Sequence, residues 1–267
     1  LARQLKEVKV VGVQHHHAHL AAVMADNGLT GEVLGIICDG TGWGTDGAIW
    51  GFEVMRGGYG SCERLGHLKY VPLPGGDLSV KKNYRMALVY LWQALGDKGL
   101  DIAGRYLPDL TQEETRLIQV QVNKGLQVVF TSSCGRLFDA VSALLGVCAM
   151  NRYEGQAASE LEAAANWTER GRYDFQIEND KGMLLLDIFP AWEGMVRDLE
   201  AGIPVGLISA RFHLTLAYMM AEAVKQVRDM TGLDRVVLSG GVFHNRLLLL
   251  ELMRLLAREG FRVYQHR

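Results

Sequence analysis

Short apolar runs alternate with longer amphipathic stretches along the chain, a pattern typical of a protein built from both strands and helices. Runs such as 33–38 and 235–239 are bounded by glycine and polar residues and predict buried strands. Stretches with apolar residues three and four positions apart predict helices. We predict strands at 8–13, 33–38, 48–55, 173–177, 183–188, 235–239 and 261–265, and helices at 15–24, 84–95, 112–124, 136–148, 156–170, 205–230 and 246–259. The order of these elements indicates an α/β fold.

Composition narrows the class of protein. The chain has 267 residues, of which 49% are hydrophobic, and this is enough for a sizeable core in one or two domains. A net charge of −2 gives no basic footprint for nucleic acid, and neither a membrane span nor a signal peptide is found, so we expect no nucleic-acid or membrane partner. The cysteines Cys38, Cys62, Cys134 and Cys148 form no CxxC pair, so we expect neither a zinc ribbon nor disulfides. The cytoplasm is the simplest setting.

Four histidines stand close together at positions 15, 16, 17 and 19, directly before the apolar part of a predicted helix. His15 and His19 are four residues apart, and such positions face the same way on a helix. Neutral imidazole is a common ligand of zinc, iron and similar ions, so the pair is a candidate metal site. The alternative is a helix with one buried, hydrogen-bonded histidine and three solvated ones.

A carboxylate and several glycines follow the strand predicted at 33–38. Asp39 ends the strand, and Gly40, Thr41 and Gly42 begin the turn that leads to the next strand. A carboxylate suits a hard cation, and glycines let backbone N–H groups approach phosphate oxygens. Residues 42–47 also fit G-x-G-x-x-G, but a strand follows instead of a helix, which argues against a dinucleotide-binding fold. The pattern predicts a β-hairpin, which either holds phosphate or is only a structural turn.

A second glycine turn separates the strand at 235–239 from the last predicted helix. Gly240 and Gly241 lie at a place where backbone amides before a helix face an anion. Asn245 is predicted to cap that helix, and it is also a candidate contact to a nucleotide. Strand–Gly–Gly–helix is common in α/β proteins, so this motif carries weight only together with the others.

In combination, the motifs resemble those of the C-terminal, TsaD-like domain of HypF, the carbamoyltransferase of NiFe-hydrogenase maturation. Each motif alone is unspecific, but together they follow the family order and span almost the whole chain. The motifs are QHHHAH at 14–19, DGTGWGTDG at 39–47, TSSCGRLFDAV at 131–141, YEGQAA at 153–158 and SGGVFHN at 239–245.

The resemblance implies an actin, hexokinase and Hsp70-like ATPase (ASKHA) fold, truncated, with most of the chain in the second lobe. Residues 1–30 are expected to be the end of lobe I with the metal-binding histidine helix. Residues 31–267 are expected to be the nucleotide-binding lobe II, truncated at its C-terminus. The family pattern has a later Asp-Gly-Gly motif whose aspartate is a metal ligand. This motif is absent from the chain, so we expect metal binding to be weakened.

The resemblance also implies roles for individual residues. His15 and His19 match the metal pair of the family, and Asp39 is implied as a further metal ligand. Asp139 matches the carboxylate that holds the ribose, although without the resemblance a solvated carboxylate on a helix surface is the simpler interpretation. The residues implied in binding the nucleotide are Asp39, Gly40, Thr41, Gly42, Gly135, Asp139, Gly155, Gln156, Gly240, Gly241 and Asn245.

The implied activity is carbamoyl transfer from a carbamoyl-adenylate to the C-terminal cysteine thiol of HypE. The adenylate is expected to be made from carbamoyl phosphate and ATP by a YrdC-like domain that this chain lacks. The implied cofactors are ATP or carbamoyl-adenylate and a divalent metal, either iron or zinc at the histidine pair, with magnesium an option at the phosphates. His16, His17 and His244 are candidate bases, and Arg85 and Arg136 are candidate phosphate contacts; the sequence selects none of them.

Three alternatives stay open. An O-carbamoyltransferase that acts on a small-molecule hydroxyl shares the fold and the histidine pair. A TsaD-type tRNA-modifying enzyme is disfavoured, because that family has Ser-Gly-Gly-His where this chain has Asp-Gly-Thr-Gly. A non-catalytic ATP-binding module is the third alternative, and tight nucleotide binding without turnover would indicate it.

Overall fold

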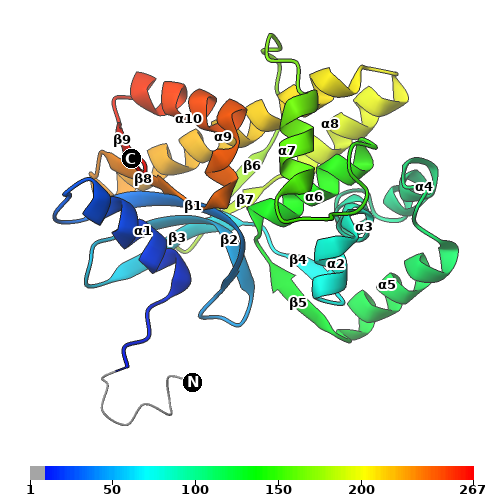
Figure 1. The fold of residues 1–267 in the computed structure, drawn as a ribbon, viewed down its shortest axis with the longest axis horizontal. Coiled ribbons are helices and arrows are strands. Elements are labelled where there is room, and N and C mark those ends of the chain that lie inside the picture. The colour runs from blue at the N-terminus through cyan, green and yellow to red at the C-terminus, as the bar shows by residue number, and fades with distance from the viewer. Residues whose placement is uncertain (1–9) are drawn as a thin grey trace.

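The computed structural model describes residues 10–267 and is built around one mixed β-sheet (Figure 1). Within these residues the sheet has nine strands, and its main path runs in the order β6-β7-β3-β2-β1-β8-β9. The other two strands, β4 and β5, pair with each other, and β5 also pairs with β2. The strands are β1 (Val33–Trp43), β2 (Ile49–Gly57), β3 (Cys62–Leu68), β4 (Val71–Pro74), β5 (Val128–Thr131), β6 (Gln176–Asp180), β7 (Met183–Asp187), β8 (Arg235–Ser239) and β9 (Arg262–Tyr264).

Helices cover both faces of this sheet. Helix α1 packs on one face against β1 and β8, whereas α6 and α9 contact β1 from the other face, with α7, α8 and α10 packed around them (Figure 1). Helices α3 and α5 contact β4, and α2 and α4 pack against α3. The helices are α1 (His15–Asp26), α2 (Asp77–Lys81), α3 (Asn83–Leu95), α4 (Asp97–Tyr106), α5 (Gln112–Lys124), α6 (Cys134–Leu144), α7 (Gln156–Ala164), α8 (Phe189–Glu200), α9 (Val205–Thr231) and α10 (Arg246–Arg258), with a short 3₁₀ helix, η2 (Gly241–His244).

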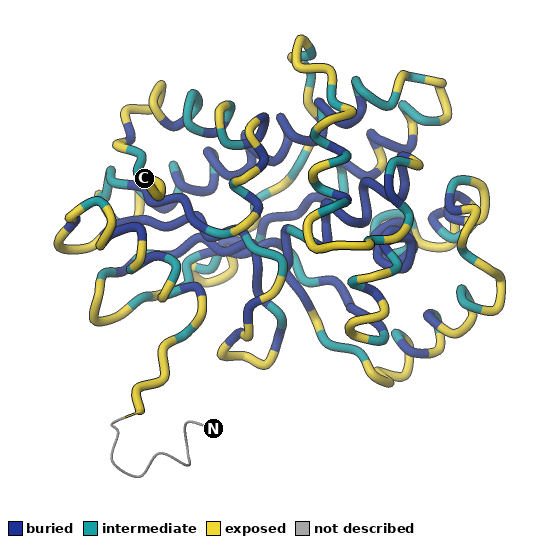
Figure 2. The backbone as a smooth tube through the Cα atoms, in the orientation of Figure 1, coloured by how far each residue is buried: buried dark blue, intermediate teal, exposed yellow. Residues whose placement is uncertain are grey.

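Strand β1 supplies core residues to both faces of the sheet. Leu34, Ile36 and Cys38 belong to the larger core on the side of α6 and α9, whereas Val33 and Ile37 pack against α1. Successive side chains of a strand point to opposite faces, so a strand that is covered on both sides reads as a continuous apolar run. The central strands are accordingly buried along most of their length (Figure 2).

The end of β1 is also the place where the sequence motifs meet. β1 runs parallel to β8, with Ile37 opposite Ser239, and antiparallel to β2. Gly240 directly follows β8 and packs against Cys38, the residue before Asp39, so both motifs lie at the same edge of the sheet. The turn predicted to begin at Gly40 was wrong, because β1 continues through Gly40, Thr41 and Gly42 to Trp43. The pairing of β1 with β2 is irregular between Cys38 and Gly42, and β-bulges of this kind re-aim the backbone.

Most of the predicted elements are confirmed. The predicted hairpin is β1–β2, and the helices predicted at 84–95, 112–124, 205–230 and 246–259 are α3, α5, α9 and α10. The four cysteines are free thiols, as expected. Among the helices of residues 10–267, none combines the length and apolar character needed to cross a membrane.

Some predicted elements were wrong. Of the strand predicted at 8–13, residues 8 and 9 lie outside the described residues, and 10–13 are exposed coil without a sheet partner. The helix predicted at 156–170 ends at Ala164, because Ala165 is already extended (φ −68°, ψ 138°). Strands β3, β4 and β5 and helices α2, α4 and α8 were not predicted.

Candidate functional site

Helix α1 begins at the histidine run because Gln14 caps it. The Gln14 side chain accepts a hydrogen bond from the backbone N–H of His17 (2.9 Å), which satisfies one of the free donors at the helix start. The same amide lies with its Nε2 3.1 Å from Nδ1 of His16. The cap starts the helix one residue before the pair of histidines that the sequence assigned to a metal.

His15, His19 and Asp39 form a cluster where α1 meets the irregular part of β1. Nε2 of His15 lies 3.0 Å from Oδ2 of Asp39, and Nε2 of His19 lies 3.3 Å from the same oxygen. Each of the three residues offers one potential ligand atom, and these three atoms lie within 4.8 Å of one another. The structure therefore brings together the three residues that the sequence assigned to a metal site.

The chemistry of this cluster fits a divalent metal ion. Two imidazole nitrogens and one carboxylate oxygen are a donor set that suits zinc and ferrous iron. Burial alone raises the pKa of Asp39, but hydrogen bonds from His19, His15 and the Gly40 N–H outweigh it, and the pKa lies well below its usual range. Asp39 is therefore an anion at neutral pH, which is the form that binds a cation.

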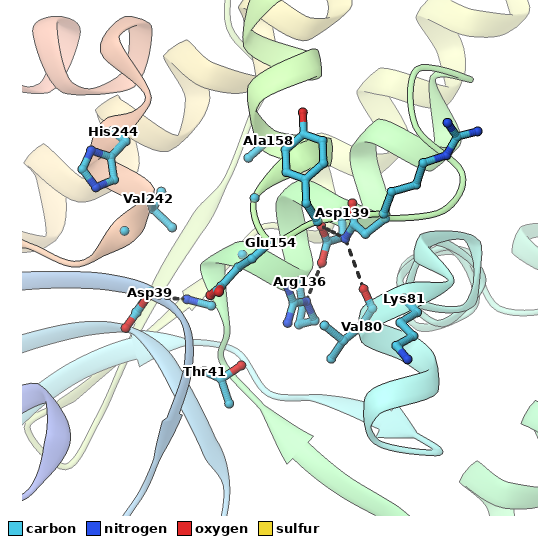
Figure 3. A pocket seen from close by; sticks show the side chains of 17 residues that line it. Asp39, Thr41, Val80, Lys81, Arg136, Asp139, Glu154, Ala158, Val242 and His244 are labelled. Atoms are coloured by element: carbon cyan, nitrogen blue, oxygen red, sulfur yellow. Dashed lines mark hydrogen bonds and ion pairs between the residues drawn. The ribbon is translucent and has the colours of Figure 1, made fainter.

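A cavity of about 660 Å³ opens beside the cluster. It lies between the end of β1, the start of α6, the end of α2, the turn before α7 and the 3₁₀ helix η2, and Asp39 and Asp139 both line it (Figure 3). Basic and acidic side chains are mixed in its wall. The lining residues are Asp39, Gly40, Thr41, Val80, Lys81, Gly135, Arg136, Asp139, Asn151, Arg152, Tyr153, Glu154, Gly155, Ala158, Gly241, Val242 and His244.

Asp139 is buried in the cavity wall and is held by two neighbours. Its Oδ2 accepts a hydrogen bond from Nε of Arg136 (2.5 Å), and its Oδ1 accepts one from Nδ2 of Asn151 (3.0 Å). Burial raises the pKa of Asp139, and the Arg136 charge and the Asn151 hydrogen bond oppose the rise only in part. Asp139 is 2% exposed, so the interpretation as a solvated helix-surface carboxylate does not hold.

Glycines let the segments around the cavity approach closely. A Cβ on Gly135 would lie 2.8 Å from the Cα of Gly40, and a Cβ on Gly240 would lie 2.0 Å from the carbonyl oxygen of Cys38. Gly240 also has φ +105°, a conformation that side chains disfavour. Gly135 and Gly240 are thus required by packing, and Gly135 forms part of the cavity wall together with its neighbour Gly40.

The predicted nucleotide residues divide into two groups. Gly42 packs against His15 and His16, Gly240 packs against Cys38, and Gln156 accepts from the Arg152 N–H (2.7 Å) and donates to Glu160 (2.8 Å). Asn245 caps α10 through the Leu248 N–H (3.0 Å), as predicted, and its Nδ2 lies 2.9 Å from Nε2 of His213. These four residues do not line the cavity. The predicted nucleotide residues that do line the cavity are Asp39, Gly40, Thr41, Gly135, Asp139, Gly155 and Gly241.

Of the three histidines considered as candidate bases, only one lines the cavity. His16 is fully buried, and burial followed by the neighbouring His15 charge lowers its pKa to about 3. Nε2 of His17 lies 2.7 Å from the carbonyl oxygen of Gly58, away from the cluster. His244 lines the cavity.

Of the two candidate arginines, only Arg136 reaches the cavity. Arg85 is 1% exposed, and its guanidinium donates hydrogen bonds to Ser79, Glu114 and Gln121. These bonds join α3 to α2 and α5. Arg136 lines the cavity at the start of α6. Arg85 therefore has a structural role, whereas Arg136 forms part of the cavity wall and donates to Asp139.

Sequence analysis missed a buried network behind the glycine hairpin. Glu53 accepts from the N–H groups of Gly51 (3.0 Å) and Phe52 (3.3 Å), from the Ser132 hydroxyl (2.6 Å) and from Nε of Arg64 (2.5 Å). The network ties β2 to the segment that precedes α6. The available signal was Glu53 itself, a charged residue in the middle of an apolar strand. Because buried charges are paired, it predicts a buried partner of opposite charge. Lys81, Arg152 and Glu154 in the cavity wall were also missed; Glu154 lies within the YEGQAA motif at 153–158, whereas no pattern marked Lys81 or Arg152.

Comparisons with known proteins agree with this geometry. Residues 35–267 match the family described as carbamoyltransferase, Kae1-like domain, second subdomain, and residues 1–26 match the HypF Kae1-like domain. The chain is 33% identical over 273 residues to a probable carbamoyltransferase HypF of Methanocaldococcus jannaschii, covering 100% of this chain and 35% of the relative. It is 36% identical over 269 residues to the carbamoyltransferase HypF of Synechocystis, covering 94% of this chain and 34% of the relative.

Solved structures give the same result. A crystal structure of full-length HypF in the phosphate- and nucleotide-bound form matches with a TM-score of 0.91 and 37% identity, over 98% of this chain and 34% of that one. A crystal structure of HypF from T. kodakarensis matches with a TM-score of 0.86 and 32% identity, over 99% of this chain and 35% of that one. The expected α/β fold of the ASKHA type is confirmed, and the chain spans about a third of the length of these relatives. The chain belongs to the HypF carbamoyltransferase family, within its Kae1-like region.

Proposed function

We propose that the cavity binds ATP or a carbamoyl-adenylate and that this part of the protein transfers the carbamoyl group to the C-terminal cysteine thiol of HypE. One observation carries the proposal: Asp39 belongs both to the cluster with His15 and His19 and to the cavity wall. A ligand in the cavity therefore lies next to the candidate metal ligands. The relatives are named carbamoyltransferases, and one solved HypF is phosphate- and nucleotide-bound, which supports a nucleotide at this place.

The residues of the wall match the parts of an adenylate. Asp139 is a carboxylate that accepts hydrogen bonds from ribose hydroxyls, and the Gly40 and Gly135 backbones permit close approach of a phosphate. The cationic side chains of Lys81, Arg136 and Arg152 provide positive charge for it. Together they hold the adenylate with its reactive end toward the His15, His19 and Asp39 cluster.

His15, His19 and Asp39 would hold a divalent ion, iron or zinc. When bound, this ion supplies Lewis-acid polarisation of a carbonyl or phosphate oxygen. The transfer requires no protein nucleophile, because the adenylate is already activated. The HypE thiol loses its proton, its sulfur forms a bond to the carbamoyl carbon, and the bond from that carbon to the phosphate oxygen breaks, so that AMP leaves.

His244 is the candidate that we propose as acceptor of the thiol proton. It lines the cavity, whereas His16 is buried with a pKa of about 3 and His17 contacts the Gly58 carbonyl. A general base must lie within reach of the proton that it removes, and among these three only His244 borders the space in which the acceptor thiol would meet the adenylate. We propose that a YrdC-like domain elsewhere in the whole protein makes the adenylate from carbamoyl phosphate and ATP.

Metal content and nucleotide binding, measured together, test the proposal. Purified protein is compared with the His15→Ala/His19→Ala double variant, and iron and zinc content and binding of a non-hydrolysable ATP analogue are measured on both. We expect about one metal equivalent in the wild type, and loss of metal with weaker nucleotide binding in the double variant. His17→Ala is the matched control, because it removes an imidazole from the same helix that points away from Asp39.

The outcomes separate the alternatives. Equal metal content and equal nucleotide affinity in the wild type and the double variant would overturn the shared site. If the site holds, full-length protein is assayed with HypE that ends in cysteine, with HypE that ends in alanine, and with small hydroxyl acceptors. Transfer only to the cysteine form supports the proposal. Transfer to a hydroxyl acceptor indicates an O-carbamoyltransferase, and tight binding without any transfer indicates a non-catalytic module.

A further inference from the structure

We propose that the Ser239 hydroxyl is a positioning group for His19, and that His266 holds this hydroxyl in the required orientation. The inference rests on the metal site of the proposed function and adds residues that lie behind it. Ser239 is the last residue of β8 and is 3% exposed. It stands opposite Ile37, two residues before Asp39, so the strand pairing places its side chain beside the cluster.

The His19 ring is held at both of its nitrogens. Its Nε2 lies 3.3 Å from Oδ2 of Asp39, and its Nδ1 lies 3.0 Å from Oγ of Ser239. A neutral imidazole that binds a metal through Nε2 carries its proton on Nδ1, and this proton needs an acceptor. The hydroxyl of Ser239 is in the position to accept it.

The hydroxyl has a second neighbour that completes the arrangement. Nε2 of His266 lies 3.4 Å from Oγ of Ser239 and can accept its proton, which leaves the lone pairs of the hydroxyl free to face His19. Nδ1 of His266 in turn lies 3.6 Å from a carboxylate oxygen of Asp26. The path from Asp26 through His266 and Ser239 to His19 begins and ends on α1.

This path gives α1 two attachments to the carboxyl end of the sheet. His19 and Asp26 are seven residues apart on the helix, and both reach toward the segment around Ser239 and His266. The side chain of Asn27 adds a hydrogen bond from its Nδ2 to the carbonyl oxygen of Gln265 (2.9 Å). The rotation of α1, and with it the direction of His19, is thereby fixed against the edge that carries Asp39.

Affinity for Zn²⁺ in the absence of nucleotide tests the inference. The dissociation constant is measured by competition with a chromophoric chelator for the wild type, Ser239→Ala and Ser239→Thr. We expect Ser239→Ala to weaken binding about 10- to 100-fold, as is usual when the hydrogen-bond partner of a ligating histidine is lost, and Ser239→Thr to restore most of the affinity. The matched control is Ser142→Ala, which removes a buried hydroxyl that has no hydrogen-bond partner and lies in α6; it should bind Zn²⁺ like the wild type.

Two further measurements keep the test independent of folding defects. His266 is half exposed, so His266→Ala should fold normally and weaken Zn²⁺ binding several-fold. In zinc-loaded wild type the Nδ1 proton of His19 should give an observable NMR signal, protected by its hydrogen bond, and Ser239→Ala should lose this signal. If the wild type and Ser239→Ala bind Zn²⁺ equally well, the role of Ser239 is overturned, but the metal site is not. A wild type that binds no Zn²⁺ overturns the metal site and this inference with it.

Discussion

The Cα of Gly40 stands so close to Gly135 that a methyl group on Gly135 would lie 2.8 Å from it. Gly40 directly follows Asp39 in β1, and Gly135 is the second residue of α6, the helix that also places Arg136 and Asp139 in the cavity wall. The cluster of His15, His19 and Asp39 and the Asp139 carboxylate, at the two ends of the cavity, are therefore connected through closely packed backbone. Substitution of Gly135 tests whether this contact sets the spacing of the cavity.

Gly135→Ala is expected to weaken both nucleotide binding and the fold. The added methyl group meets backbone that has no flexible end to move aside, so the two segments must separate, at a cost of about 1–3 kcal/mol in free energy of unfolding. We expect the affinity for an ATP analogue to fall at least about tenfold, measured by calorimetry. Gly104→Ala is the control, because a Cβ there meets nothing within 4 Å. Unchanged affinity in Gly135→Ala would contradict the role of the contact.

Asp139→Asn tests whether this carboxylate binds the ribose. Asparagine keeps the shape but replaces one acceptor oxygen and removes the charge that faces Arg136. We expect ATP binding to weaken about tenfold. We also expect a smaller preference for ATP over 2′-deoxy-ATP, because the side chain loses one of the two oxygens that can accept hydrogen bonds from the ribose hydroxyls. Both affinities are measured for the variant and for Glu193→Gln, an exposed carboxylate on α8 that serves as control. If affinity falls equally for both nucleotides, Asp139 only holds Arg136 and Asn151.

Sequence patterns anticipated the clustering of His15, His19 and Asp39 better than the short elements around it. His15 and His19 could be paired from helical spacing alone, and Asp39 could be placed from the end of an apolar strand. Helical spacing could not place Asp139, because periodicity does not reveal which polar residue of a helix faces a buried cavity. Its burial depends on Arg136 and Asn151, whose side chains come from the helix start and from a loop.

Short elements escaped prediction for a related reason. Strand β4, at Val71–Pro74, contains two prolines, which usually mark turns, and it is a strand only because β5 pairs with it from far along the chain. The opposite error occurred at 10–13, where Val10, Val11 and Val13 have strand character but lie exposed without a partner strand. In both cases the deciding interaction is non-local, and a local pattern does not contain it.

The buried pair of Glu53 and Arg64 should make a large contribution to stability. Glu53 is fully buried, and Arg64 has 9% of its side chain exposed. Removal of Glu53 leaves Arg64 with only the partly exposed Asp46 as a counter-ion (3.2 Å) and leaves the other donors to Glu53 unpaired, and breaking a buried pair in this way typically costs about 3–5 kcal/mol. We expect Glu53→Ala to lower the free energy of unfolding by about this amount in urea titrations, and a Glu53→Met/Arg64→Met double variant to recover part of it.

An exposed ion pair provides the comparison for that prediction. Asp234 lies 2.7 Å from Arg262, with about half of each side chain exposed, and such pairs contribute little because water and salt screen them. Asp234→Asn should therefore leave the urea midpoint almost unchanged. A Glu53→Ala variant that is as stable as Asp234→Asn would show that the network behind the hairpin has no structural role.

His213 lies at the centre of a buried contact between α9 and α10. Its Nδ1 lies 2.7 Å from the carbonyl oxygen of Ser209, and its Nε2 lies 2.9 Å from Nδ2 of Asn245, the residue that caps α10. Donation of the Nδ1 proton to the carbonyl leaves Nε2 as the acceptor for Asn245, so the neutral ring satisfies both neighbours. Burial lowers the pKa of His213 to about 4.

Stability should consequently fall as the pH decreases below neutrality. The unfolded chain protonates His213 near pH 6.5, whereas the folded protein resists protonation until about pH 4, so the stability is fully present above pH 6.5 and is lost as the pH falls from there toward 4. Between pH 7.5 and 5.5 this residue should account for about 1.4 kcal/mol of the loss. Burial lowers the pKa of His67 to about 4 as well, which adds a loss in the same direction. His213→Gln, which does not titrate, should show a shallower pH dependence of the free energy of unfolding in urea, and identical slopes for the variant and the wild type would rule out this assignment.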